Sequence, residues 1–317
     1  MAAKRPALKP SHLALLLGAG WAVLTALAGI VATATQYHDE SPISRRDFIN
    51  VPSPVKGIFY TVLPITFVLV GYLFSQRAQN WERGGPDRRT QDRKTIPQRL
   101  RSFRAGAYMQ TLMRDGAAGL MHSLIYFPFL ILFAVTTVLI INEQLPPSLK
   151  FLRGDIYRGY SLIGDLAGVA FLVGIGWAIV RRYIQRPYRI RIKTRPEDGM
   201  ILGTFLVIGV TGLVTEAMRI ALVGRPAHEK WSVVGWPMSG LFDTMDNIAG
   251  WHQALWILHV AAFITFLVLL PTTKLRHMVT SPVNMYLSDR ERPKGAMKPL
   301  PNLTETSLET FGANAIE

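Results

Sequence analysis

The sequence predicts an all-α protein: a polytopic membrane helical bundle of six transmembrane helices with both termini in the cytoplasm. Hydrophobic residues make up 49% of the 317 residues and charged residues only 18%, a balance that favours a membrane protein over a soluble one. Six apolar windows are each close to the roughly 20 residues that cross a bilayer as a helix. Basic residues alternate between the connecting loops, which indicates the orientation.

The six predicted spans follow one another along the whole chain. They cover residues 12–34, 57–75, 118–141, 161–180, 200–222 and 251–270, and only Asp165, Glu216 and Arg219 bring charge into them. We expect four parts: 1–56 with the first helix, 57–117 with the second helix and a basic loop, 118–280 as a four-helix core, and 281–317 as a cytoplasmic linker.

The distribution of Lys and Arg predicts the orientation of these spans. One side of the predicted bundle carries 26 of the 35 basic residues in its loops and termini, and the other side carries seven. Because basic loops are retained in the cytoplasm, the N-terminus is predicted to be cytoplasmic. The net charge of +14 therefore reflects topology, and we expect no nucleic-acid partner. The basic loop 76–117 is open to two interpretations: a retention segment touching anionic membrane lipid, or a docking surface for an acidic cytoplasmic partner.

The chain contains no cysteine. It therefore holds no disulfide, no iron–sulfur cluster, no thiolate zinc site and no covalently attached c-type haem of its own. Any bound metal cofactor has to use histidine, methionine or oxygen ligands.

Histidines near the third and sixth spans are the candidate ligands. His122 begins a span that runs outward and His277 follows one that runs inward, so both are predicted near the cytoplasmic edge. His259 lies 18 residues before His277, about five helical turns, which places the two on one face at opposite depths. Pro271 lies between them and can kink the helix.

Two imidazoles from different helices at one depth are the ligands that a bis-histidine b-type haem needs. A zinc or copper ion would usually require a third ligand, and none is evident at that depth. A proton relay and a structural hydrogen bond are the alternatives for intramembrane histidines. A second haem bound through His259 would need a further ligand, so the sequence leaves the number of haems open at one or two. His252 is expected to cap the outer end of the site, against a propionate or a quinone.

Charged residues of the fourth and fifth spans are candidates for quinone and proton chemistry. Glu216 and Arg219 lie one helical turn apart near the outer end, where they form either a structural ion pair or a proton carrier and quinone contact. Asp165 is expected at the membrane interface. The glycines of these spans predict close helix packing.

Two stretches carry a family resemblance. The segments MHSLIYFPFLILFAVTT, from Met121, and WHQALWILHVAAFITFLVLLPTTKLRHMVTSP, from Trp251, resemble the membrane cytochrome b subunits related to the nitrate reductase gamma subunit and the heterodisulfide reductase membrane subunit. Those subunits carry two histidines 18 residues apart on their final helix, as His259 and His277 are here. Their second histidine on the earlier helix corresponds to Leu132, which supports the His122 and His277 haem but not an outer one.

The closer resemblance is to bacterial fusion proteins in which such a membrane half precedes a cytoplasmic iron–sulfur domain, and the ending ETFGANAIE is similar to that junction. The resemblance implies a membrane oxidoreductase of the bacterial inner membrane that relays electrons from electron-transfer flavoprotein, through iron–sulfur clusters on a domain or partner, to menaquinone. It leaves open a quinol-oxidising subunit that runs the other way. A haem-free proton-coupled transporter and a plain membrane anchor are the alternatives from other classes.

Overall fold

The structure of the protein is a computed structural model that describes residues 8–34, 41–45, 48–83, 93–110 and 112–287. Across these ranges the chain is helical, with no β-strand. His38 and most of the linker expected over 281–317 lie outside the described residues.

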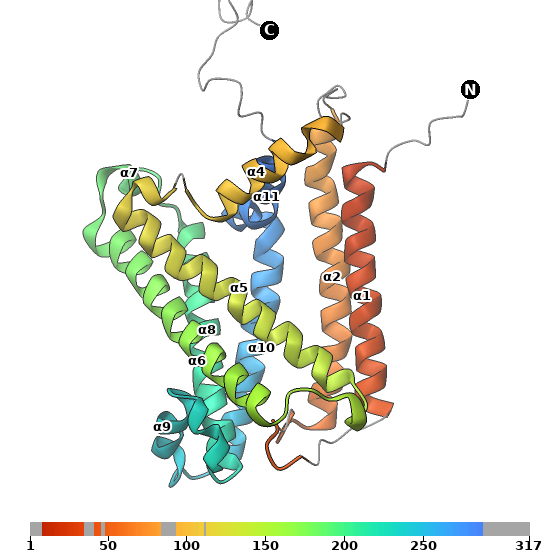
Figure 1. Ribbon diagram of the computed structural model, residues 1–317, viewed down its shortest axis with the longest axis vertical. Helices are drawn as coiled ribbons and strands as arrows, with labels where there is room; N and C mark the ends of the chain where they lie inside the picture. The colour runs from red at the N-terminus through yellow and green to blue at the C-terminus, as the bar shows by residue number, and fades with distance from the viewer. Residues whose placement is uncertain (1–7, 35–40, 46–47, 84–92, 111, 288–317) are drawn as a thin grey trace, which may run out of the picture.

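Six helices are long and apolar enough to cross a membrane, which confirms the predicted six-span bundle within the described part of the chain. They are α1 (Pro10–Ala34), α2 (Ser53–Glu82), α5 (Gly116–Gln144), α6 (Gly154–Ile179), α8 (Pro196–Leu222) and α10 (Ile248–Thr272). The helix of α6 continues for one π-helical stretch, Val180–Gln185, so it extends beyond the predicted span. Figure 1 shows these helices running side by side, with α1 and α2 forming one flank.

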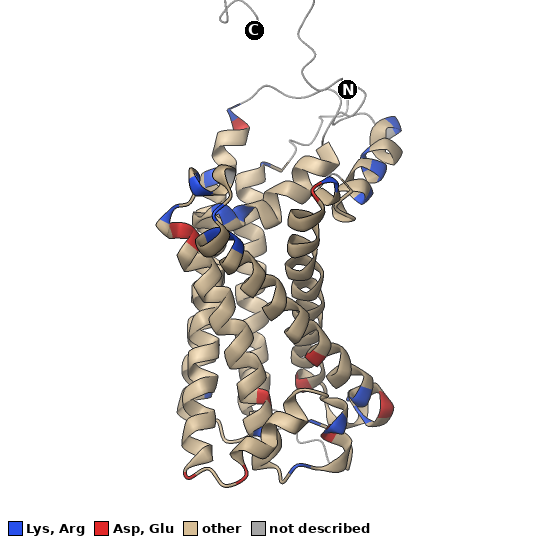
Figure 2. Cartoon of the chain, turned by 90° about the vertical axis from the view of Figure 1, so that its left-hand side faces the viewer, with Lys and Arg blue, Asp and Glu red and all other residues tan. Residues whose placement is uncertain are grey.

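Shorter helices lie at the two ends of the bundle. They are α4 (Ile96–Ala107), α7 (Tyr188–Arg191), α9 (Gly235–Ser239) and α11 (His277–Leu287). Lys and Arg gather at the end that carries α4, α7 and α11 (Figure 2). This is the end that the basic loops predict to face the cytoplasm, and we refer to the opposite end, with α9, as the outer end.

Small residues and aromatic rings hold the bundle together. Gly18 of α1 lies against Gly71 of α2, where an added Cβ would lie 2.7 Å from the Gly71 Cα atom. Close glycine contacts of this kind let membrane helices approach one another. At mid-height α5, α6, α8 and α10 each contribute one ring to a phenylalanine layer. Its members, with neighbouring centroids 5.5 to 6.4 Å apart, are Phe129, Phe171, Phe205 and Phe266.

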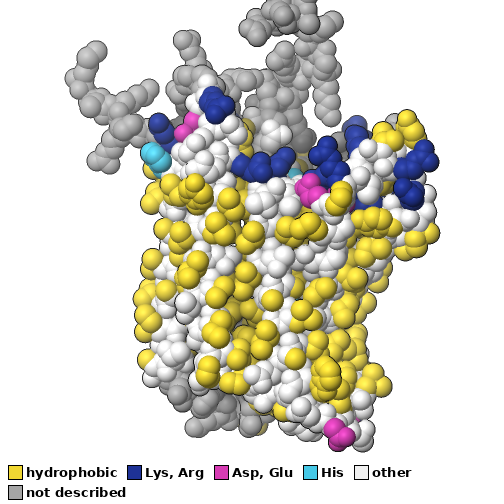
Figure 3. All heavy atoms as spheres, turned by 180° about the vertical axis from the view of Figure 1, so that it is seen from behind, with side chains coloured by type: hydrophobic (Ala, Val, Ile, Leu, Met, Phe, Trp, Pro, Cys, Tyr) yellow, Lys and Arg dark blue, Asp and Glu magenta, His cyan; other side chains and the backbone are white. Residues whose placement is uncertain are grey.

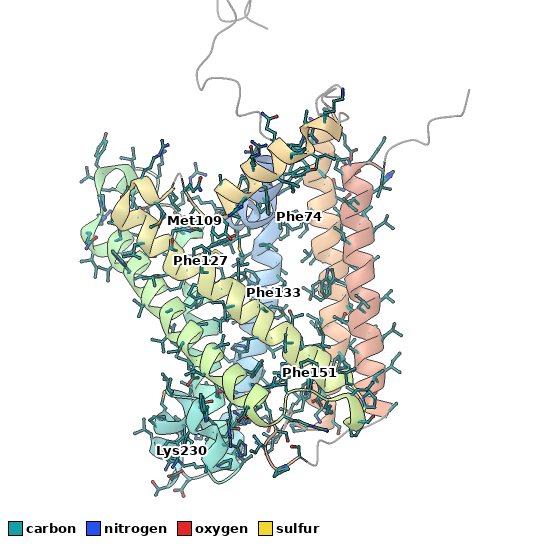
Figure 4. The ribbon with its side chains drawn as sticks, in the orientation of Figure 1. Phe74, Met109, Phe127, Phe133, Phe151 and Lys230 are labelled. Atoms are coloured by element: carbon teal, nitrogen blue, oxygen red, sulfur yellow. The ribbon has the colours of Figure 1, made fainter. Side chains whose placement is uncertain are left out.

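The outer surface of the helices is apolar. Figure 3 shows hydrophobic side chains along the full height of the bundle, with charge confined to its ends. On α5, Phe127 and Phe133 are exposed side chains of this surface (Figure 4). A surface of this kind is stable when lipid covers it.

Candidate functional site

The end that carries α4, α7 and α11, predicted to be cytoplasmic, holds a pair of histidines. His122 lies on α5 and His277 is the first residue of α11, and their ring centroids are 6.3 Å apart with planes inclined at 64°. His277 Nδ1 lies 2.7 Å from the Lys274 carbonyl oxygen. Because a carbonyl only accepts, Nδ1 carries the proton and Nε2 is free to bind a metal. His122 Nδ1 is buried and has no hydrogen-bond partner among the described residues.

A corner in the chain positions His277. After Pro271 the helix α10 ends at Thr272, and a 3-10 turn, Lys274–Arg276, redirects the chain into α11. His259 and His277 therefore do not lie along one straight helix face, because the kink that Pro271 made possible is a full break.

Charged side chains from neighbouring helices hold this corner. Arg77 Nε of α2 donates to the Pro271 carbonyl oxygen at 2.6 Å. Lys274 Nζ donates to both carboxylate oxygens of Asp198 on α8, at 2.8 and 2.9 Å, and Arg182 pairs with the same carboxylate at 2.8 Å. The backbone N–H of Lys274 donates to the Glu197 carboxylate at 2.5 Å. The position of His277 thus depends on α2 and α8 as well as on α10.

A second site lies near the outer end. It is a cavity of about 180 Å³, and its wall comes from α8, α10 and the segment that precedes α2. The lining residues are Arg45, Phe48, Ile49, Val51, Gly212, Thr215, Glu216, Arg219, His252, Trp256 and His259. The cavity unites four residues that the sequence singles out: Glu216, Arg219, His252 and His259. No residue of α5 is among its lining residues, and nothing in the sequence pointed to Arg45, Phe48, Ile49 and Val51.

The two outer histidines are held differently. The Thr211 hydroxyl donates to the Val207 carbonyl oxygen at 2.6 Å and lies 3.0 Å from His259 Nδ1. Since that hydroxyl has one proton, it accepts from His259 Nδ1–H, which leaves His259 Nε2 as a lone-pair nitrogen. His252 is 3% exposed, and its Nδ1 has no partner among the described residues. Both histidines line the cavity.

Arg219 pairs mainly with a residue that sequence reasoning missed. Its guanidinium binds both carboxylate oxygens of Glu229 at 2.6 and 3.2 Å, whereas Glu216 lies at 3.8 Å. The Tyr157 hydroxyl donates to the same Glu229 carboxylate at 2.9 Å. Burial by itself would raise the pKa of Glu229, but the Arg219 charge and these hydrogen bonds outweigh it and hold that pKa below its ordinary value. The only sequence signal was an acidic residue in the loop after an intramembrane arginine.

Two further carboxylates complete the outer end. Asp165 is fully buried, and its Oδ2 accepts from the N–H groups of Val234 and Gly235 at 2.6 and 3.0 Å. Asp165 is therefore shielded within the protein, because the α8–α10 connection folds over it, and its expected position at the membrane interface stays a prediction. Glu216 accepts a hydrogen bond from the Ser232 hydroxyl at 3.1 Å and forms part of the cavity wall. Glu216 is thus the one carboxylate among the described residues that line the cavity.

Comparison with known proteins agrees with this architecture. The sequence pattern of the nitrate reductase gamma subunit matches residues 122–292. The chain is 30% identical over 277 residues to the EtfAB:quinone oxidoreductase of Syntrophomonas wolfei subsp. wolfei (strain DSM 2245B / Goettingen), covering 83% of this chain and 37% of that protein. It is 25% identical over 211 residues to the probable iron-sulfur-binding oxidoreductase FadF of Bacillus subtilis (strain 168), covering 65% and 29%. No solved structure matches the chain.

The fold and these relatives define the class, a polytopic membrane domain of oxidoreductases with a role in electron transfer. The chain spans about a third of the length of the curated relatives that it matches. Within that class, the chain belongs to the nitrate reductase gamma subunit family, because the family pattern covers more than half of it.

Proposed function

We propose that this chain is a membrane b-type cytochrome that relays electrons between a cytoplasmic iron–sulfur or flavoprotein system and menaquinone. The observation that carries the proposal is the separation of the His122 and His277 rings, 6.3 Å between centroids. An imidazole nitrogen lies about 2 Å from a metal that it binds and about 1 Å from its own ring centroid, so two rings that held one metal ion between them would lie roughly 6 Å apart. The spacing therefore suits one iron ion bound between the two rings.

The surroundings of the pair also suit a haem. The hydrogen bond of His277 Nδ1 to the Lys274 carbonyl oxygen leaves Nε2 free, and metal-binding histidines typically donate their other ring N–H in this way. Among the described residues no three His, Asp or Glu side chains cluster as metal ligands, so a zinc or copper site of the usual kind has less support. A haem held here supplies an iron whose valence change carries an electron through low-dielectric protein.

We assign one haem to the chain and assign the outer cavity to a quinone headgroup. His259 faces Thr211 and Gly212 of α8, and no residue of α5 lines the cavity, so a second axial ligand opposite His259 has no evident source. Quinone reduction takes up two protons, and Glu216, His252 and His259 are titratable groups at the cavity wall. Glu216 is the proposed proton carrier, and Arg219 provides a permanent positive charge beside it.

The names of the relatives support the proposed donor and acceptor. One is an EtfAB:quinone oxidoreductase and the other a probable iron-sulfur-binding oxidoreductase. We therefore propose electron-transfer flavoprotein as the donor, iron–sulfur clusters on a domain or partner outside these residues, and the bacterial inner membrane as the location. A quinol-oxidising subunit with the same parts and the opposite direction is the alternative.

The haem proposal is tested by the variants His122→Ala and His277→Ala. Each should abolish the α-band in a dithionite-reduced minus oxidised spectrum, with haem counted by pyridine haemochrome and insertion checked in isolated membranes. His12→Ala, an exposed histidine on α1, is the matched control and should keep its haem. Normal haem content in both test variants would rule the assignment out.

The quinone assignment is tested by Glu216→Gln. Loss of a proton-transfer group should lower the rate of quinone reduction by about 10²-fold or more while haem content stays normal. Asp155→Asn, an exposed carboxylate at the same end, should react at the unaltered rate. An unchanged rate in Glu216→Gln would remove this residue from the proton path.

A further inference from the structure

The helix α4 lies at the predicted cytoplasmic end and has three distinct faces. The first face is buried against α11. The Arg99 guanidinium lies 5.8 Å from the centroid of the Tyr286 ring, and Gly106 approaches Met285 so closely that a Cβ atom would collide with its sulfur. This face attaches α4 to the helix that begins with His277.

The second face of α4 is apolar and uncovered. Ile96, Leu100 and Phe103 are exposed by 38%, 54% and 38%, and their spacing of four and three residues places them in one stripe. The stripe leads on to Leu112 and Met113, which are also exposed and precede α5. Exposed apolar side chains therefore occur both on α4 and directly before α5.

The third face of α4 is basic. Arg101 and Arg104 are exposed beside the apolar stripe, and the sequence IPQRLRSFRAGA contains no acidic residue. Neither side chain makes an ion pair with a described residue, and Arg104 lies over the Tyr108 ring at 5.8 Å. Two adjacent guanidinium groups without a carboxylate suit a phosphate group.

The placement of α4 joins these faces to the membrane. Figure 1 shows α4 crossing the end of the bundle at an angle to the spanning helices, next to α11, and in Figure 2 it projects sideways from that end. A helix with an apolar stripe and a basic flank at this level has the composition of an in-plane, interfacial helix.

We propose that α4 lies in the cytoplasmic leaflet and that Arg101 and Arg104 bind the phosphate of an anionic phospholipid. The apolar stripe enters the acyl region while the two arginines extend to the headgroups. The membrane is the favoured partner, because an apolar stripe beside a basic flank matches the boundary between acyl chains and headgroups. Since α4 packs on α11, the lipid also braces the helix that carries His277.

The absence of cysteine makes the test direct, because one introduced cysteine is labelled alone. The full chain with Leu100→Cys carries an environment-sensitive fluorophore in phosphatidylcholine nanodiscs, with a minor fraction of spin-labelled phosphatidylglycerol or spin-labelled phosphatidylcholine. We expect stronger quenching by spin-labelled phosphatidylglycerol, since each basic residue near the surface favours anionic lipid by about fivefold.

Charge variants and a second label position complete the design. Arg101→Gln with Arg104→Gln should make the two lipids quench equally, and Arg101→Lys with Arg104→Lys should keep the preference. A label at Leu149→Cys, exposed at the outer end, should show no preference. Quenching of the Leu100 label by aqueous iodide but not by lipid would mean that α4 stands in water or under a protein partner. Equal quenching by the two lipids in the labelled chain that keeps Arg101 and Arg104 would exclude an anionic lipid site.

Discussion

At the scale of single residues, Arg219 shows how the outer half of the bundle tolerates a charge. Arg219 and Glu229 are 4% and 1% exposed, and Tyr157 adds a hydrogen bond to the same carboxylate. A buried charge is stable only while its partner and its hydrogen bonds are in place. Glu229 is therefore the buried partner of Arg219, a role that its position in a loop of the sequence does not indicate.

Replacing Glu229 should leave Arg219 without its main partner. We expect Glu229→Gln to lower the free energy of unfolding by about 3 kcal/mol, since breaking a buried pair costs about 3–5 kcal/mol. Asp155→Asn, which breaks the exposed pair with Arg158, should change it by less than about 1 kcal/mol. Thermal unfolding in detergent measures both, and equal stability of the two variants would contradict the buried-pair account.

The lowered pKa of Glu229 also predicts a pH dependence. A carboxyl whose folded-state pKa lies below its unfolded value stabilises the fold above the unfolded value, about 4.3, and loses that contribution as the pH falls through the folded value. Melting temperatures recorded from pH 7 down to pH 3 should therefore fall on acidification. The fall should be shallower in Glu229→Gln, and parallel curves would show that other groups cause it.

At the scale of elements, the corner between α10 and α11 places His277. Arg77, Asp198 and Lys274 connect it to α2 and α8 through hydrogen bonds of 2.6 to 2.9 Å. A ligand on a short helix after a break has less intrinsic order than one inside a long span, so we expect these contacts to set its position.

Asp198→Asn should loosen this corner without removing any proposed ligand. We expect the midpoint potential and the spectrum of the haem to shift and the haem to be lost faster in detergent, because the histidine is held less firmly. Redox titration and pyridine haemochrome counts over time measure these changes. An identical potential and identical retention would show that the corner does not control His277.

The elements were largely predictable from sequence, and the polar contacts were not. Apolar length alone identified six spans, because a bilayer demands it. The matching depth of His122 and His277 followed from span direction. The break after Pro271 and the pairing of Arg219 with Glu229 did not, because both depend on where loops fold back. For the same reason, the sequence did not indicate that Arg45, Phe48, Ile49 and Val51 line the outer cavity.

At the scale of the whole molecule, the basic end predicts an orientation that labelling can test. Single cysteines at Gln185, on the basic end, and Ser148, at the outer end, are exposed positions in a chain without other cysteines. A membrane-impermeant maleimide should label Ser148→Cys in intact cells and Gln185→Cys only in inverted vesicles. The reverse labelling pattern would place the histidine pair on the outer side of the membrane and the cavity on the cytoplasmic side.

The phenylalanine layer formed by Phe129, Phe171, Phe205 and Phe266 has an electrical consequence. On α10, Phe266 lies between His259 at the cavity and the corner that precedes His277, so the layer lies between the two sites. Under the proposed function, an electron exchanged between the two ends would cross this layer and so move through much of the transmembrane field, a difference of up to about 2.3 kcal/mol for each 100 mV. In the proposed orientation, a membrane potential that is negative inside would drive electrons from the histidine pair toward the outer cavity, and the rate of the proposed relay would depend on voltage.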